Sequence, residues 1–374
     1  MAKTDFTNMG LEKRLAWGNG LWEVARTRMF VARFMSTGPN AVIQRITSLK
    51  KVKGAARAVI QLVADLQEDG VGGDASELEG KEEALRAFEQ IIDYDMLRHA
   101  VRNTGRLSDM KSTISFRNSA KNKLGYFFGD RIDQMAFLML SGISFQFNNN
   151  GSARTGGATG TLPKLVFHKI TAPTSNRHLR VKGKDIAAGA TASMTSADII
   201  NYRSLVRAKA FLKDTGLRGL RIGYNDMLHV FVTTTGMADL RLDEDFMNAV
   251  KEAGARGDSN PIFKGTSSVM VDGMMIHEYK YVYNTTGAAA GSKWGADGNV
   301  NGMRALICGS QALGFFDHSA PQWNEKTFDY GNQTGIATGK IFGMLKPVFH
   351  NDWTGQNEDY GVAVLDCALS QRPA

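Results

Sequence analysis

The chain has 374 residues, of which 43% are hydrophobic and 22% are charged, and its formal net charge is +8. This composition is typical of a soluble globular protein with one large or two medium cores. No segment approaches the roughly 18 uninterrupted apolar residues that a membrane span needs. The N-terminus lacks the basic and then apolar pattern of a signal peptide, so we expect synthesis in a cytosol and no membrane partner.

The charged residues lie in blocks of alternating sign. Residues 13–57 are rich in Lys and Arg, residues 65–95 are rich in Asp and Glu, and residues 98–111 are basic again. Such blocks are either solvated faces or guides for head-to-tail association with a second copy. The sequence pI near 9.3 also fits contact with nucleic acid.

The first 40 residues carry a weak helical pattern of apolar side chains between Leu11 and Phe30, which ends at the breaker pair Gly38-Pro39. Trp17 and Trp22 would be a liability if this segment were isolated in water. We therefore expect this arm to lie against another surface, such as that of a neighbouring subunit.

Two β-favourable runs follow, at residues 42–49 and 58–66, and the basic residues 50–54 are predicted to form the turn between them. The second run also fits a short helix. An acidic, glycine-rich loop over residues 68–74 comes next, and residues 85–92 have mixed helical and extended character.

The clearest predicted element is a helix over residues 108–140, with Ser108 as its N-cap and Asp109 at its positive end. Its apolar side chains recur at helical spacing, and no proline interrupts it. A helix of this length would be a rod of roughly 45 Å. Gly125 and Gly129 permit either close packing or a slight bend. The apolar stripe predicts that the helix packs on a sheet.

A polar, glycine-rich segment over residues 145–160 is predicted to be a linker or loop that divides the chain near residue 150. The second half predicts short strands and helices, and the fold class is therefore α+β. The predicted helices cover residues 196–212 and 243–253, and the predicted strands cover residues 220–222, 229–232, 268–271, 275–283, 305–308 and 361–368.

The sequence predicts no catalytic residue, metal site or cofactor. His277-Glu278 lacks the second His of an HExxH motif, and Asp317-His318-Ser319 places triad residue types side by side, although a triad needs them to converge from separate elements. Cys308 and Cys367 lie in apolar runs without CxxC spacing, which is typical of buried reduced thiols.

Many short motifs, in order along the chain, resemble one known family. They lie at residues 62–66, 69–71, 78–84, 97–100, 130–137, 171–178, 259–261, 263–266, 271–273, 276–278, 282–285, 292–296, 328–330 and 339–343. Each motif is weakly specific by itself, but together they run almost end to end. The sequence resembles the major capsid proteins of tailed phages, specifically the N-four-type podophages and related prophages, which adopt the Hong Kong 97 capsid fold.

The resemblance implies a role for each segment of that fold. Residues 1–40 would be the N-terminal arm and 41–107 the extended loop region that lies over an adjacent subunit. Residues 108–194 would hold the spine helix and peripheral domain, 195–330 the axial domain, and 331–374 the C-terminal return to the core sheet. The charge blocks then fall on the arm and extended loop.

The inferred function is self-assembly, through hexamers and pentamers, into the icosahedral shell that encloses double-stranded DNA. The implied partners are further copies of the chain, a separate scaffolding protein, a portal and a decoration protein, with non-specific contact to DNA phosphates. The implied location is the virion capsid, assembled in the host cytoplasm. The candidate inter-subunit contacts are Trp17, Trp22, Lys50, Lys51, Lys53, Glu68, Asp69, Asp74, Glu79, Glu82 and Glu83.

Two alternatives stay open at this point. The same fold also builds encapsulin-like cellular compartments, which would require a cargo-docking site. A soluble DNA-binding protein is suggested only by the pI, and tight binding by the monomer at physiological salt would favour it.

Overall fold

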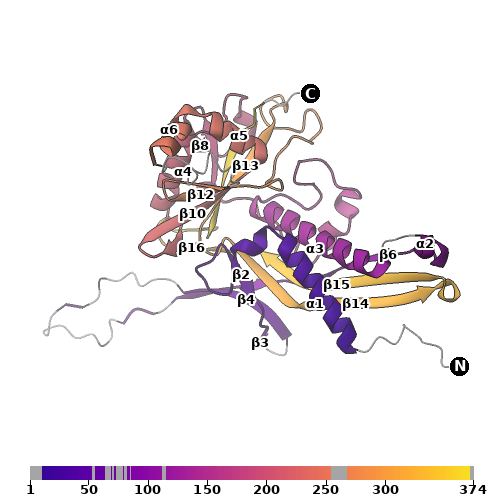
Figure 1. The fold of residues 1–374 in the computed structure, drawn as a ribbon. Helices are drawn as coiled ribbons and strands as arrows, with labels where there is room; N and C mark the ends of the chain where they lie inside the picture. Colours follow the sequence, from indigo (N-terminus) through magenta and orange to yellow (C-terminus); the bar gives the residue numbers. More distant parts are fainter. Residues whose placement is uncertain are drawn as a thin grey trace.

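The computed structural model describes residues 11–52, 55–63, 69, 71–72, 79, 82–84, 86–111, 115–253 and 268–370. Two sheets form the body of the molecule, and a smaller hairpin projects from it (Figure 1). One hydrophobic core contains residues of both sheets, and a second core lies against the larger sheet. Neither sheet is made from one continuous stretch of sequence.

The first sheet has five strands in the order β1-β2-β14-β15-β6. Helices α1 (Leu11–Arg28) and α3 (Phe116–Leu140) cover one of its faces, where α1 contacts β14 and α3 contacts β15 and β6 (Figure 1). The strands are β1 (Met35–Ser36), β2 (Ile43–Ile46), β6 (Asp95–Arg102), β14 (Leu313–Phe328) and β15 (Gln333–Leu345).

The second sheet follows the order β11-β12-β10-β13-β18-β7-β8, with β9 paired to β10. Its strands are β7 (His178–Lys182), β8 (Asp185–Ala188), β9 (Leu220–Ile222), β10 (Asn225–Val232), β11 (Ser268–Val271), β12 (Met274–Glu278), β13 (Gly302–Cys308) and β18 (Val362–Ala368). Helices α4 (Tyr202–Asp214), α5 (Thr234–Leu242) and α6 (Glu244–Ala253) share a core with one face. The other face packs toward α3, where the ring centroids of Phe137 and Phe231 lie 5.5 Å apart.

Two smaller sheets complete the fold. The three-stranded sheet contains β3 (Lys50–Val52), β4 (Ala55–Val63) and β5 (Ala87–Ile92), and the two-stranded sheet contains β16 (Val348–Asn351) and β17 (Gln356–Asp359). Short helices are α2 (Arg106–Lys111), η2 (Val31–Phe34), η3 (Gly157–Thr159), η4 (Leu162–Lys164), η5 (Ser175–Arg177), η6 (Thr191–Ser193) and η7 (Asp329–Gly331).

Several predicted elements are confirmed. The N-terminal helix is α1, and the apolar runs at residues 305–308 and 361–368 are the buried strands β13 and β18, which pair with each other. The hairpin predicted at Asp272-Gly273 joins β11 to β12, and both residues have positive φ angles of 48° and 66°. This is the backbone that a two-residue type I′ turn requires.

The prediction of a single long helix over residues 108–140 is wrong in one respect, because the chain forms two helices there. Ser108 and Asp109 lie inside α2, and the backbone at Ser115 is extended before α3 begins. Serine is a weak helix former, which fits the extended backbone at Ser115. The 25 residues of α3 make a rod of about 37 Å.

Other boundaries also differ from the prediction. The helix predicted at 196–212 begins at Tyr202, because the side chain of Asn201 accepts the N–H of Ser204 in a capping box. The strand predicted at 275–283 ends at Glu278, so the tyrosines at 279, 281 and 283 do not form a strand ladder. Helix α5 was not predicted, because it starts in a run of threonines that favours strands.

The basic segment predicted as a turn is largely a strand. Lys50 and Lys51 belong to β3, where they pair with Arg57 and Ala56 of β4. The run at residues 58–66, for which a short helix was the alternative, contributes to β4 and is a strand over its described residues. The mixed segment before residue 92 contains β5, also a strand.

The segment at residues 145–160 is an ordered connection rather than an open linker. Phe147 and Ala153 form an isolated bridge, and the amide of Asn149 donates to the carbonyl oxygens of Gln134 and Tyr281. The division predicted at residue 330 falls in the turn between β14 and β15, so both sides of it belong to the five-stranded sheet. The assignment of chain segments to named capsid domains stays a prediction.

Candidate assembly surfaces

The tryptophans of the arm lie on α1 and contact their own subunit. The Trp17 ring stacks on Trp323 of β14 with centroids 5.4 Å apart, and the Nζ atom of Lys340 lies 4.1 Å from the centre of the Trp22 ring. Both side chains are half-buried. Their predicted role in inter-subunit contact stays a prediction.

A buried charge cluster lies beneath Trp22. Lys340 is fully buried and pairs with Asp317, whose Oδ2 atom also lies 2.5 Å from the Nη2 atom of Arg45. Burial lowers the pKa of Lys340, and Asp317 opposes that shift. Asp317 contacts both Lys340 of β15 and half-buried Arg45 of β2, and so ties β2 to the β14–β15 hairpin.

The chain after α1 crosses between the two sheets. The carboxylate of buried Asp133 on α3 accepts hydrogen bonds from the backbone N–H groups of Phe30 and Val31, at 2.8 and 3.2 Å, and from the hydroxyl of Tyr279. The Phe30 ring stacks on Tyr279 with centroids 4.0 Å apart. This junction joins the arm, the long helix and the second sheet.

His277 belongs to the same junction. Its Nε2 atom lies 2.8 Å from Nδ1 of His229, and burial lowers the pKa of both rings, to about 4 for His277. The rings of Phe34 and Phe231 pack against it. Two neutral histidines in an aromatic cluster are a packing arrangement, and Glu278 takes no part in the pairing of the rings.

A second buried network joins three strands of the larger sheet. Arg304 of β13 holds Asp366 of β18 through two bonds of 2.7 and 3.0 Å, and His178 of β7 lies 2.7 Å from the same carboxylate. Burial opposes ionisation of Asp366, but the charge of Arg304 and these hydrogen bonds outweigh it and hold the pKa low.

The acidic loop, defined as residues 64–86, joins β4 to β5. Asp69, Glu79 and Glu82 are exposed and Glu83 is half-buried, whereas the predicted contacts Lys53, Glu68 and Asp74 lie outside the described residues. The loop has eight acidic residues against Lys81 and Arg86, a net charge of −6. The base of the hairpin is anchored by a small core that contains Ile60, Ile92 and Phe316.

The face of the five-stranded sheet that α1 and α3 leave uncovered was not predicted. Its exposed cations are Arg98 and Arg102 of β6 and Lys326 of β14, and none of them pairs with a carboxylate among the described residues. The ring of Phe328 lies between two of these cations, 4.2 Å from Arg102 and 5.1 Å from Lys326. The cross-strand rows of this basic sheet face are Arg98–Gly339–Gln322, Ala100–Ala337–Asn324 and Arg102–Gly335–Lys326.

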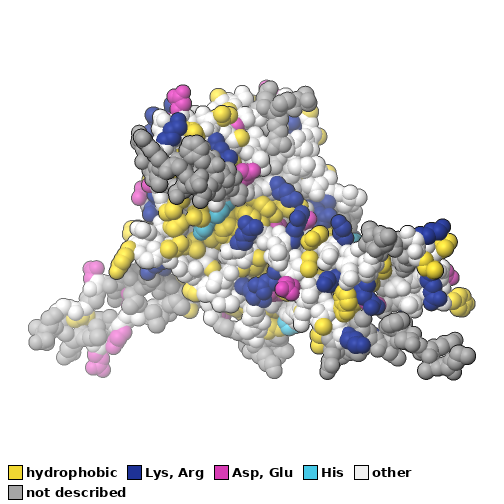
Figure 2. Space-filling view, in the orientation of Figure 1, with side chains coloured by type: hydrophobic (Ala, Val, Ile, Leu, Met, Phe, Trp, Pro, Cys, Tyr) yellow, Lys and Arg dark blue, Asp and Glu magenta, His cyan; other side chains and the backbone are white. Residues whose placement is uncertain are grey.

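The opposite, helical side of this sheet is also basic. Figure 2 shows Lys and Arg side chains spread over the side where α1 and α3 lie, with few carboxylates among them. The helix face is defined by the cations Lys13, Arg26, Arg28, Arg33, Lys121, Lys123 and Arg131, with the carboxylates Glu23 and Asp130. Seven cations against two anions give it a net charge of +5.

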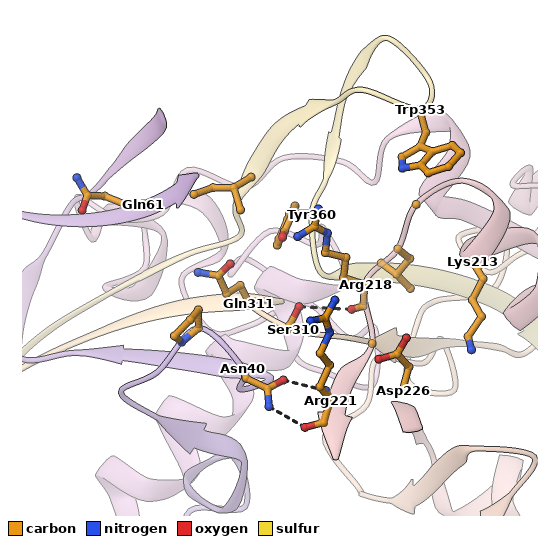
Figure 3. A pocket seen from close by; sticks show the side chains of 15 residues that line it. Asn40, Gln61, Lys213, Arg218, Arg221, Asp226, Ser310, Gln311, Trp353 and Tyr360 are labelled. Atoms are coloured by element: carbon orange, nitrogen blue, oxygen red, sulfur yellow. Dashed lines mark hydrogen bonds between the residues drawn. The ribbon is translucent and has the colours of Figure 1, made fainter. Parts of the chain in front are cut away.

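A cleft of about 910 Å³ lies between the base of the hairpin and the second sheet (Figure 3). Gln61 of β4 and Trp353, whose side chain is 83% exposed, lie on its rim. Its floor is held by Asn40, which accepts the N–H of Arg221 at 2.9 Å and donates to the Arg221 carbonyl at 2.8 Å. The cleft brings together the end of the arm and segments of both sheets.

Within the described part of the chain, no group of three or more His, Cys, Asp or Glu side chains is placed to hold a metal ion. Cys308 and Cys367 are buried free thiols, and burial raises the pKa of both. None of the described helices is long and apolar enough to cross a membrane.

Residues 13–371 match the family model described as phage capsid protein. The sequence is 44% identical over 365 residues, 96% of each chain, to the major capsid protein of Pseudomonas phage KPP25. Among solved structures, the capsid of Ralstonia phage GP4 has a TM-score of 0.75 at 24% identity, with 100% of this chain and 96% of that chain covered. The capsid asymmetric unit of cyanophage Pam1 has a TM-score of 0.69 at 17% identity, with 100% and 97% covered.

The chain belongs to the phage capsid protein family. Its function is that of a major capsid protein, which forms the shell of a phage, and the predicted Hong Kong 97-like α+β fold is confirmed. Copies of the chain assemble with one another, and the chain's location is the virion capsid. These matches support neither the encapsulin-like compartment nor the soluble DNA-binding protein.

Proposed function

We propose that this chain assembles through hexamers and pentamers into an icosahedral shell for double-stranded DNA, in a structural and not a catalytic role. The observation that carries the proposal is the 44% identity to a phage major capsid protein over 96% of both chains. Weak contacts repeated over a closed shell provide large collective stability and still allow errors to be corrected during assembly.

In this scheme the predicted domains keep their boundaries as proposals. Residues 1–40 are the arm and 41–107 the extended loop region, which reaches an adjacent subunit. The inter-subunit contacts are proposed to include the arm tryptophans and the charged residues of the hairpin, whose exposed members Asp69, Glu79 and Glu82 support this role.

The helix face is proposed to point into the shell and contact DNA. Its net charge of +5 suits attraction to phosphates, which is non-specific and weakens as salt concentration rises. Several of its cations, such as Lys123 and Arg26, have exposed side chains.

The further proposed partners are a separate scaffolding protein, a portal and a decoration protein, and the proposed place of assembly is the host cytoplasm. These rest on the resemblance to tailed-phage capsid proteins. The cleft of about 910 Å³ lined by Trp353 and Arg218 is large enough for a side chain of a partner.

Electron microscopy of the purified protein tests the scheme. The protein is expressed alone and again with the genes that neighbour its own. We expect closed shells, or free hexamers and pentamers, in at least one preparation. A monodisperse monomer in every preparation would contradict the proposal.

A further inference from the structure

We infer that the pocket between α1 and strands β1, β2 and β14 is a binding site for a phosphate group, held by the guanidinium groups of Arg26 and Arg45. This site rests on the proposed contact of the helix face with DNA and gives that contact one defined point, because Arg26 belongs to the helix face. The phosphate is either part of the DNA backbone or a free ion.

The pocket has the size and the donors that a phosphate group needs. Its volume is about 240 Å³, which is several times the roughly 30 Å³ that one water molecule occupies in the liquid. Arg26 of α1 and Arg45 of β2 line it, and the side chains of Ser36 and Thr37 add two hydroxyl groups. Guanidinium and hydroxyl groups are donors suited to phosphate oxygens, and a guanidinium can bind two of them at once.

Cations outnumber anions at this pocket. Arg26 and Arg45 line it together with Asp317, and buried Lys340 pairs with the same carboxylate. Three cations against one anion leave a net charge of +2. Asp317 already binds both Lys340 and Arg45, whereas Arg26 pairs with no carboxylate in the described part of the chain. A phosphate group would supply the negative charge that the cluster lacks.

The three cations are close enough to repel one another. Burial lowers the pKa of Lys340, and the positive charges of Arg45 and Arg26 lower it further, against the opposing effect of Asp317. An anion in the pocket relieves this repulsion. Its binding therefore gains free energy from charges that the fold already holds in place.

The remaining wall of the pocket is largely apolar. Trp22, Met29 and Phe315 line it, and Met29 and Phe315 are buried. Apolar walls keep water away from the charged groups and so strengthen their attraction to an anion. An exposed cation such as Lys123 attracts phosphate more weakly, because water and salt screen its charge.

A wider groove adjoins the pocket and gives access to it. The groove has a volume of about 600 Å³ and shares four lining residues with the pocket, among them Trp22 and Arg26. Exposed Arg33 also lines the groove, where Glu23 is the single carboxylate. Arg26 therefore lies where groove and pocket meet, and a phosphate group that enters from the groove reaches it directly.

Binding of inorganic phosphate to the purified protein tests the site. Arg26→Gln removes an exposed guanidinium, and circular dichroism checks that the variant is folded. Calorimetric titration at constant ionic strength should give a Kd that is about tenfold or more higher than that of wild type. Arg98→Gln removes the same group from the opposite face of the sheet and is the matched control, with a Kd within about twofold of wild type.

A variant that conserves charge separates a defined site from general attraction. Arg26→Lys keeps the positive charge but loses the planar fork of donors, so its Kd should lie between those of wild type and Arg26→Gln. The inference is overturned if the wild type binds phosphate no better than chloride. An unchanged Kd in Arg26→Gln would overturn it as well.

Competition with DNA distinguishes the two sources of phosphate. A labelled DNA duplex is bound to wild type and to Arg26→Gln, and inorganic phosphate is added at constant ionic strength. If the pocket receives the DNA backbone, phosphate displaces the duplex more from wild type than from Arg26→Gln. If the pocket receives a free ion, phosphate binds wild type and the duplex stays bound to both.

The same titrations separate failure of the site from failure of the proposed DNA contact. A wild-type protein that binds the duplex at low salt but no inorganic phosphate would overturn the site alone. A wild-type protein that binds inorganic phosphate but no duplex would instead contradict the DNA contact of the helix face and support a site for the free ion.

Discussion

Asp133 is the residue on which the junction between the arm, α3 and the second sheet depends. It is completely buried and accepts two backbone N–H groups and one tyrosine hydroxyl. Burial raises its pKa to about 6, although the three donors favour the ionised form and limit the shift. Because burial disfavours the charged form, ionising the carboxylate that holds the arm costs free energy.

This pKa predicts how stability depends on pH. Because the pKa of Asp133 is higher in the folded chain than its ordinary value of 3.8, its contribution to stability is complete below pH 4 and is lost as the pH rises through 6. Relative to Asp133→Asn, the wild type should lose about 2.4 kcal/mol of unfolding free energy between pH 4 and pH 7. Chemical denaturation of both proteins at several pH values measures this difference.

Tyr279→Phe supplies the matched variant. It removes the hydroxyl that favours the ionised carboxylate, so the pH range over which stability is lost should move upward relative to wild type. A difference between wild type and Asp133→Asn that stays constant from pH 4 to pH 7 would contradict the assigned environment.

At the scale of elements, the packing of α1 on α3 depends on two glycines. A Cβ added at Gly125 would lie 2.9 Å from Cγ1 of Val24, and one added at Gly129 would lie 3.0 Å from the carbonyl oxygen of Ala25. Of the two predicted roles for these glycines, close packing of helices is therefore the one the contacts support. A backbone oxygen cannot move aside without moving the helix.

Alanine substitution distinguishes a packing glycine from an exposed one. Gly129→Ala should lower the unfolding free energy by about 1–3 kcal/mol, because the new clash outweighs the gain in helix propensity. Gly20→Ala in α1 has its nearest neighbour atom at 4.0 Å and should instead raise it by up to about 1 kcal/mol. Thermal unfolding of both variants measures the two shifts, and equal shifts of the same sign would contradict the packing role.

The elements that the sequence predicted correctly are those with strong local signals. The Asp272-Gly273 turn and the apolar runs of β13 and β18 are of this kind. The extended backbone at Ser115, immediately before α3, interrupts an otherwise helical pattern, and local periodicity could not predict it. The long β14–β15 hairpin was missed because its glycines and polar residues make no strong strand pattern, and its pairing with distant β6 stabilises it.

The candidate contact surfaces, like the elements, could be predicted only where their signal is local in the sequence. The acidic loop was recognised from its composition alone. The basic sheet face depends on Lys326 lying in register with Arg102, 224 positions earlier, through Gly335 between them. The alternation of Arg98, Ala100 and Arg102 was the one local signal that could have indicated an exposed strand face.

At the scale of the whole molecule, the formal charge of +8 is unevenly distributed: residues 64–86 carry −6, whereas the helix face and the basic sheet face carry +5 and +3. The helix face is the surface proposed to contact DNA. In the proposed shell, salt-dependent attraction to phosphates would follow from this distribution of charge.

A reconstruction of the assembled shell by electron cryomicroscopy tests this account most directly. In the proposed shell α1 and α3 face the lumen, and the β4–β5 hairpin of one subunit reaches an adjacent subunit. A hairpin that contacts only its own chain, or a shell in which α1 and α3 face outward, would contradict this arrangement.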